Sequence, residues 1–146
     1  MAAMSNYLEN KLIDFIFRGQ SYSAPANTYI GLFTTTPSDT GGGTEVTGGD
    51  YARVDVGSTL ANWAGTQSAG STTTSSGTNG TTSNNNAITF PAPTADWGSI
   101  SGFGMFDNAS GGNLLFYGEL TTHKTVNNGD AAPTFSAAAL SIQIDN

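Results

Sequence analysis

The sequence contains no cysteine and only one histidine. Without cysteine the chain has neither a disulfide framework nor a thiolate nucleophile, so its stability must come from packing or from partners. One histidine and no cysteine also cannot supply the ligands of an ordinary zinc site. The histidine, His123, stands in the polar stretch TTHKT, and no G-x-S-x-G motif accompanies it. We expect a solvated turn residue there and no catalytic base.

Charged side chains are scarce, at 10% of residues, and mostly acidic, with four basic residues, eleven acidic residues and a net charge of −7. The basic residues Lys11, Arg18, Arg53 and Lys124 are spread along the chain. Nucleic-acid binding requires a basic surface that neutralises phosphates, and attraction to anionic lipid requires a basic cluster. The sequence therefore predicts no nucleic-acid partner and no membrane partner.

Long hydrophobic runs are also missing, because none approaches the ~20 apolar residues of a membrane-spanning helix. The opening MAAMSNYLENK lacks the basic and apolar regions of a signal peptide. We therefore expect synthesis in the cytoplasm of the host cell. The length fits a single domain, residues 1–146.

Residues 64–86, AGTQSAGSTTTSSGTNGTTSNNN, carry no charge and no apolar side chain larger than alanine. Such a segment cannot bury enough apolar area to offset its conformational entropy, so we expect it to be mobile in a free monomer. One interpretation is a tolerated insertion. The other is an arm that lies extended on a neighbouring subunit, and its candidate contact residues are Thr72, Ser75, Thr78, Asn79 and Thr82.

Residues 6–18, NYLENKLIDFIFR, form the one segment with a convincing helical pattern. Asn6 is suited to cap this helix with Glu9 at capping-box spacing, and Gly19 is a natural stop. Four apolar residues share one face at i, i+4, i+7 and i+8 spacing, and they are Leu8, Leu12, Phe15 and Ile16. This face packs either on the protein's own sheet or on a partner, and we take the four residues as candidate partner contacts.

The rest of the chain is rich in β-forming residues and in turn signals such as NASGGN and NNGD. Expected strands lie within residues 27–37, 51–57, 87–90, 97–107, 114–126 and 133–144. Several short strands at fairly regular spacing, with no alternation of helix and strand, favour an antiparallel β-sandwich of jelly-roll type. We therefore predict a mostly β fold with one N-terminal α-helix.

Candidate chemistry is weak. Oxygen ligands for calcium occur at Asp107-Asn108 and at residues 127–130, but these pairs are ordinary turn residues. A glycosidase needs two carboxylates, and Asp107 and Glu119 lie near aromatic residues, yet no local motif marks them. We expect no enzyme activity, no cofactor and no metal, and we keep a small polysaccharide depolymerase using Asp107 and Glu119 as a rival hypothesis.

Several stretches resemble a known family, including SNYLENKLIDFIFRGQ, APANTYIGLFTTTPSD, ITFPAPTADWG, GGNLLFYGEL and TVNNGD. They are similar to small proteins encoded in the structural gene clusters of tailed phages and prophages, often labelled tail-fibre proteins. Others of similar size and composition resemble capsid cement or decoration proteins, which have a jelly-roll fold. The resemblance covers most of the chain outside residues 64–86 and implies a virion structural protein.

Of these alternatives we favour a capsid cement protein on the outer surface of the head, because the chain shows no fibre-like repeat and its acidic charge suits a position away from packaged DNA. The expected partner is the major capsid protein, and we expect self-association as a dimer or trimer. The alternative is a tail-fibre or baseplate-associated protein involved in host attachment.

Overall fold

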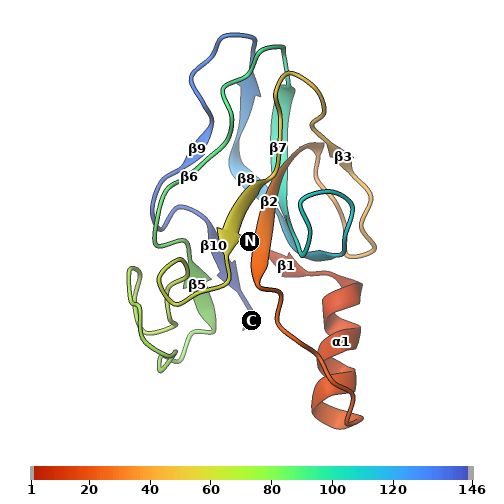
Figure 1. Cartoon of the computed structure of the whole chain (residues 1–146), viewed down its shortest axis with the longest axis vertical. Coiled ribbons are helices and arrows are strands. Elements are labelled where there is room, and N and C mark those ends of the chain that lie inside the picture. The colour runs from red at the N-terminus through yellow and green to blue at the C-terminus, as the bar shows by residue number, and fades with distance from the viewer. Residues whose placement is uncertain (1, 145–146) are drawn as a thin grey trace.

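The structure, a computed structural model, describes residues 2–144. It contains one helix and ten strands (Figure 1). In chain order these are β1 (Ala3–Met4), α1 (Asn6–Phe17), β2 (Asn27–Thr35), β3 (Thr44–Glu45), β4 (Val54–Gly57), β5 (Thr81–Ser83), β6 (Ile88–Thr89), β7 (Gly98–Phe106), β8 (Leu114–Val126), β9 (Thr134–Phe135) and β10 (Ser141–Gln143).

Six strands form the main sheet, in the order β1-β8-β7-β2-β3, with β4 also paired to β2. All its pairs are antiparallel. The centre consists of β2, β7 and β8, which hold the longest apolar runs of the chain. β2 and β7 contain runs of consecutive buried residues, so side chains are buried on both faces of the sheet. This is expected for a sheet that is covered on one side and partly covered on the other.

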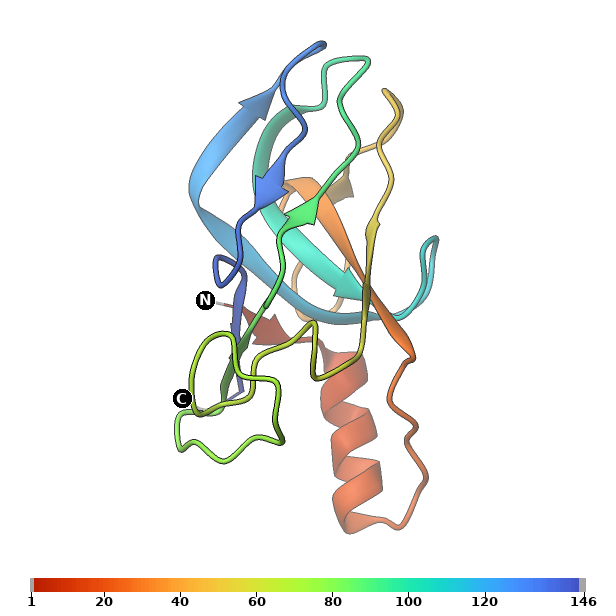
Figure 2. The ribbon, with the colours of Figure 1, turned by 60° about the vertical axis from the view of Figure 1, so that its left-hand side comes forward.

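A large bulge interrupts the pairing of β7 with β8. Ile100 lies opposite Lys124 and Gly102 lies opposite Glu119, so Ser101 alone faces residues 120–123 of β8. Extra residues on one strand bend that strand and increase its local twist. The second half of β8 therefore curves away from the line of β7, as the strongly bent arrow in Figure 2 shows.

The second layer is a long two-stranded ribbon in two parts. β5 pairs with β10, with Ser83 opposite Ser141, and β6 pairs with β9, with Ile88 opposite Phe135. Four residues on one side of the interruption face five on the other, so the register shifts by one residue there.

Asn84 fills this interruption and is 1% exposed. Its side-chain Nδ2 donates to the carbonyls of Asn86 and Ser136, both at 2.8 Å, and its Oδ1 accepts from the Leu140 N–H at 2.8 Å. The side chain thus replaces the backbone bonds that the irregular register leaves unmade, which is how buried polar groups are normally accommodated.

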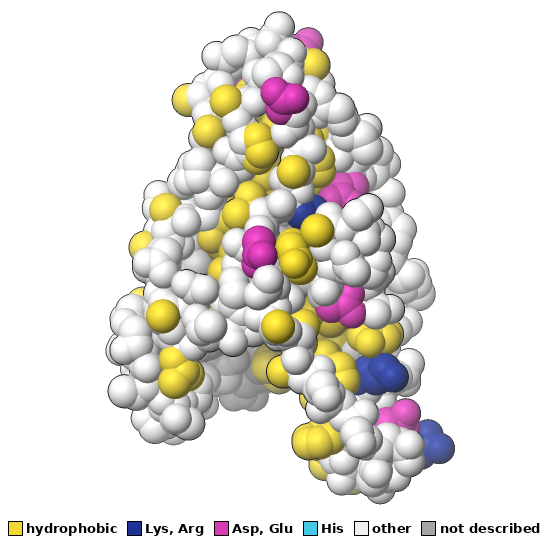
Figure 3. Space-filling model, viewed as in Figure 1, with side chains coloured by type: hydrophobic (Ala, Val, Ile, Leu, Met, Phe, Trp, Pro, Cys, Tyr) yellow, Lys and Arg dark blue, Asp and Glu magenta, His cyan; other side chains and the backbone are white. Residues whose placement is uncertain are grey.

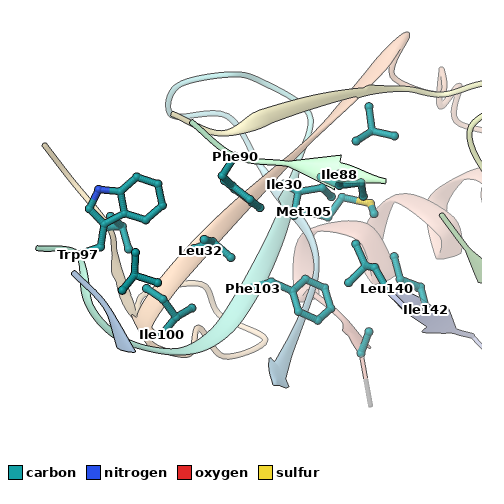
Figure 4. Close-up of a cluster of buried hydrophobic side chains, with 14 residues drawn as sticks. Ile30, Leu32, Ile88, Phe90, Trp97, Ile100, Phe103, Met105, Leu140 and Ile142 are labelled. Carbon is teal, nitrogen blue, oxygen red and sulfur yellow. The ribbon is translucent and has the colours of Figure 1, made fainter. Parts of the chain in front are cut away.

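The main core lies between the sheet and the ribbon. Figure 4 shows Ile30, Leu32, Phe103 and Met105 from β2 and β7 on one side. Facing them are Ile88, Phe90, Leu140 and Ile142 from the ribbon, all at most 3% exposed. A smaller cluster of Phe33, Phe106 and Leu114 packs on the other face of the sheet.

The prediction of a mostly β, antiparallel fold with one N-terminal helix is confirmed. The two layers are unequal, however, with one six-stranded sheet and one interrupted ribbon. The helix ends at Phe17 rather than residue 18, and its N-cap is Ser5 rather than Asn6. The expectation that residues 64–86 form one mobile segment is wrong for its last part, because residues 81–83 form β5 and Asn84 is buried.

Ser5 joins α1 to the sheet. Its side-chain oxygen accepts from the Leu8 N–H and its hydroxyl donates to the carbonyl of Leu114, while its own N–H donates to the carbonyl of Leu115. Ser5 and not Asn6 is the N-cap, because the backbone of Ser5 is extended and bonded to β8, whereas Asn6 is the first residue of the helix.

We expect Ser5→Ala to lower the free energy of unfolding by about 1–2 kcal/mol, since an N-cap and one buried hydrogen bond are both lost. Urea denaturation measures this change. Asn6→Ala is the matched control and should change stability by less than about 0.5 kcal/mol, since Asn6 is an exposed polar residue without a capping role. A larger loss at Asn6 than at Ser5 would contradict this assignment of the cap.

Candidate docking surface

Helix α1 exposes an unusual amount of apolar surface. Ile13, Phe15, Ile16 and Phe17 are 50%, 53%, 62% and 78% exposed, and we call these four residues the α1 tip. Leu8, at the base, is the only buried residue of the helix. At 3.6 residues per turn the apolar residues of α1 cover an arc of about 200°, roughly twice the stripe that a surface helix normally buries.

The helix projects from one end of the β body, and the loop of residues 64–80 projects from the same end (Figures 1 and 2). Figure 3 shows these two projections as separate lobes, with hydrophobic side chains on the lobe of α1. The other two large hydrophobic residues exposed within residues 2–144 are Leu60, which precedes the loop, and Ile144, which follows β10. We call this end of the molecule the docking end.

A groove of about 320 Å³ lies beside the base of α1. Its lining includes Ala3, Met4, Glu9, Tyr117 and Ile144. Glu9 belongs to the helix, β1 and β8 supply the floor, and Ile144 contributes an exposed apolar wall. The groove is therefore continuous with one side of α1.

The predicted helix contacts are divided between two environments. Leu8 is buried against the body and Leu12 is half-buried, whereas Phe15 and Ile16 are exposed. Ile13 and Phe17, which the i, i+4, i+7, i+8 spacing did not select, are also exposed. The signal was the width of the apolar arc, because one sheet surface cannot cover 200° of a helix.

The predicted arm residues lie mostly on the surface of the 64–80 loop. Thr72, Ser75, Thr78 and Asn79 are exposed, and Thr82 is half-buried in β5. Some of them already have partners within the chain, since the Thr66 N–H donates to Ser75 Oγ at 3.3 Å and Thr82 Oγ1 donates to the Ala64 carbonyl at 2.7 Å. The loop is thus folded on itself by side-chain hydrogen bonds.

A largely buried ionic network, which the sequence analysis did not predict, lies on the face of the sheet opposite the main core. Arg53 makes a bidentate pair with Glu45, with both N···O distances at 2.8 Å. Its Nη1 also donates to the carbonyls of Asn108 and Gly111, and its guanidinium lies 3.4 Å from the centre of the Phe106 ring. The network thereby ties the β7–β8 hairpin loop to β3.

Tyr51 completes the network. Its hydroxyl donates to Glu45 at 2.9 Å and accepts from the Leu32 N–H at 2.8 Å. Burial, reinforced by the Glu45 carboxylate, raises the pKa of the Tyr51 phenol above its ordinary value. Gly31 leaves the necessary space, because a Cβ there would lie 2.7 Å from the Glu45 carboxylate oxygen.

The residues considered for catalysis do not converge. His123 is exposed on β8. Glu119 lies opposite Gly102 and Asp107 follows the other end of β7, so about five strand positions, roughly 16 Å, separate the two carboxylates along the sheet. Glycosidase carboxylates lie about 5–10 Å apart. Asp107 instead accepts two hydrogen bonds from Asn113 and closes the hairpin loop.

Within residues 2–144 no group of three or more histidine, aspartate or glutamate side chains is placed to hold a metal ion. The only helix in the same range is too short and too polar to cross a bilayer.

No curated protein matches the chain. A family model described as "Podophage GP4 fiber I protein gp80" matches residues 3–143, which include α1, both β layers and the 64–80 loop. The chain therefore belongs to this podophage GP4 fiber I protein family and is a structural protein of a phage virion.

Proposed function

We propose that this protein is a non-catalytic component of a phage fibre and that its docking end attaches it within the virion. The observation that carries the proposal is the exposure of the four large hydrophobic side chains of the α1 tip, on one short helix that projects from the β body. Apolar surface concentrated in one place marks an interaction site rather than general exposure. The description of the family as a fiber protein supports a fibre rather than the head.

The opposite end has a different character. Its loops, residues 47–50, 91–97 and 127–133, are connected by hydrogen bonds, including those from Trp97 Nε1 to the Gly49 carbonyl and from the Asn128 N–H to Asp96. These cross-linked loops carry no exposed large apolar side chain among the described residues, although small hydrophobic residues are visible at this end in Figure 3. We infer that this end faces solvent when the docking end is engaged.

A second candidate function is capsid cement, in which the protein binds the major capsid protein on the outer surface of the head. The specific observation in its favour is the loop of residues 64–80, which projects beside α1 and is suited to reach an adjacent subunit. Binding to the assembled shell alone would stabilise the shell by mass action. The jelly-roll arrangement of such proteins remains a prediction for this chain.

Copy number per virion separates the two functions. Quantitative gel densitometry of purified virions compares this protein with the major capsid protein. Near-equimolar amounts support the cement function and contradict the fibre function. A ratio roughly two orders of magnitude lower, as expected for a closed symmetric assembly at one tail, supports the fibre function.

We expect Ile16→Asp to lower incorporation into virions by about tenfold or more, because it places a charge in the exposed apolar surface of the α1 tip. The measurement is immunodetection on virions assembled with the variant as the sole copy. The folded state should be unchanged, since Ile16 is 62% exposed. Normal incorporation of this variant would exclude α1 from the attachment surface.

A further inference from the structure

We propose that the groove beside the base of α1 binds an extended, basic peptide segment of another virion protein, which enters between β1 and β10 as an added strand. The proposal rests on the proposed function and deepens it, because it gives the chemistry of the partner that the docking end meets. Addition of a strand to an open sheet edge is a recurring mode of peptide recognition, in which backbone hydrogen bonds hold the peptide and alternate side chains give specificity.

The first argument is the open edge of β1. The Ser5 N–H donates to the Leu115 carbonyl of β8. The next N–H along the chain, that of Asn6, points the other way and donates to the Asp39 carbonyl. Because backbone groups alternate in direction along a strand, the N–H and C=O of Met4 point away from β8. Among the described residues no other strand pairs with β1 on this side.

The second argument is a matching open edge on β10. The Ile144 N–H donates to the Gly80 carbonyl, on the side of β5. By the same alternation Ile142 also faces β5, whereas the N–H and C=O groups of Ser141 and Gln143 point away from it. In the part of the chain that the structure describes, β10 pairs with β5 alone.

Both edges border the same groove. Its lining includes Met4 from β1 and Gln143 from β10, but no residue of β5, so the groove lies on the open side of β10. The two strands lie close together in both ribbon views (Figures 1 and 2), yet they are not paired. The groove volume of about 320 Å³ is within the range of ligand sites. A strand placed there would pair with both edges and join the main sheet to the ribbon.

The floor of the groove selects apolar side chains. Ala2, which is 6% exposed and belongs to the main core, lines the groove together with Ala3 and Tyr117. Every second side chain of a bound strand would point towards this floor. The segment that fits therefore carries an apolar residue at alternate positions.

The charge of the groove selects basic side chains at the other positions. Glu9 and Asp39 both line the groove and both are exposed. Neither takes part in an ion pair among the described residues, and no basic residue lines the groove. The whole chain carries a net charge of −7, which adds to the attraction. Complementary charge at the rim of an interface speeds association and excludes acidic competitors.

The basic residues of this chain cannot form such a segment. Lys11 lies in α1 and Arg18 follows it, Arg53 is held in the ionic network, and Lys124 lies opposite Ile100 in the sheet. Within residues 2–144 none of them offers a free basic side chain on an unpaired extended segment. The proposed occupant is therefore a different protein.

The probe is a short synthetic peptide of alternating valine and lysine, added to the full-length protein and followed by NMR. We expect saturable binding. At ten times the dissociation constant, hydrogen exchange at the Met4 and Gln143 amides should slow about tenfold, because each gains a partner in the bound state. The Ala3 and Ile142 amides are internal controls, since they already face β8 and β5 and should not change.

Two further controls separate backbone pairing from charge. The same peptide with alternate N-methylated amides keeps its side chains but loses donors, and it should not bind. The double variant Glu9→Gln with Asp39→Asn should raise the dissociation constant about fivefold or more. Asp14→Asn with Asp55→Asn removes the same charge outside the groove and should leave the dissociation constant within about twofold.

Three results would each overturn the proposal: no saturable binding of the valine–lysine peptide, equal binding of its N-methylated form, or unchanged exchange at Met4 and Gln143. If the peptide fails but Ile16→Asp is lost from virions, the proposed function stands and only the groove is excluded. If the peptide binds as expected but Ile16→Asp is incorporated normally, the groove remains a peptide site and α1 is excluded from attachment.

Discussion

Asn84→Ala is expected to lower the free energy of unfolding by at least about 4 kcal/mol, a large share of the roughly 5–15 kcal/mol that stabilises an ordinary domain. The substitution leaves the carbonyls of Asn86 and Ser136 and the N–H of Leu140 without the partners that Asn84 provides. Each buried polar group left without a partner costs about 1–3 kcal/mol, and the cavity adds to this cost. Urea denaturation followed by circular dichroism measures the change.

Asn84→Asp tests the same site with almost no change of shape. The carboxylate still accepts from Leu140 but cannot donate to two carbonyls, and it places a charge where the side chain is 1% exposed. We expect a loss at least as large as that of the alanine variant. Asn86→Ala is the control, because its exposed amide makes only 3.3 Å contacts to Ala61 and Asn62. Equal effects at both asparagines would show that Asn84 has no special role in the ribbon.

Arg53→Ala is the second variant with a large expected effect, a loss of about 3–5 kcal/mol. The Arg53 side chain is 8% exposed in its pair with Glu45, which is 24% exposed, so its removal leaves a largely covered carboxylate without its counter-charge. The two hairpin carbonyls of Asn108 and Gly111 lose their donor as well. Arg53→Lys should recover only part of the loss, because an ammonium cannot make the forked pair and the stacking contact together.

Arg18→Ala provides a matched comparison on the same chain. Arg18 also pairs with a carboxylate at 2.9 Å, that of Asp14, but the Arg18 side chain is 70% exposed and that of Asp14 is 36% exposed. Exposed pairs of this kind contribute about 0.5 kcal/mol or less. The difference between the two arginine variants isolates the effect of burial, and a double variant Arg53→Leu with Glu45→Met should be less unstable than Arg53→Ala because no charge is left alone. Similar losses for Arg18→Ala and Arg53→Ala would refute the network's role.

Much of the fold could be predicted from local sequence. The 3.6-residue pattern of residues 6–18 predicts the helix, and the long β-rich runs predict β2, β7 and β8. These patterns are long enough to determine the type of element without information about tertiary contacts. Strand β5 escaped notice because Thr81 and Thr82 lie in a segment without apolar residues, and its partner, β10, is about 60 residues further along the chain. Strand propensity depends on such neighbours more than on the strand itself.

The candidate site was predictable only in part. Periodicity identified the apolar face of α1, but it could not show that the body covers Leu8 and leaves Phe15 and Ile16 exposed, since coverage depends on where the sheet ends. The ionic network was hidden for a related reason. Arg53 and Glu45 look like ordinary surface charges in the sequence, and only the pairing of β3 and β4 with β2 brings them together over Phe106.

The bulge between β7 and β8 has a consequence for the behaviour of the protein at high concentration. A long, flat outer strand is a template for cross-β stacking, in which copies add edge to edge without limit. On its outer side, β8 pairs with β1 only at Phe116 and Tyr117. The curved half that follows has no strand partner on this side among residues 2–144. The extra residues 120–123 twist this half, and Lys124 adds a positive charge to it. The protein can therefore accumulate before virion assembly with this edge protected against amyloid-like growth.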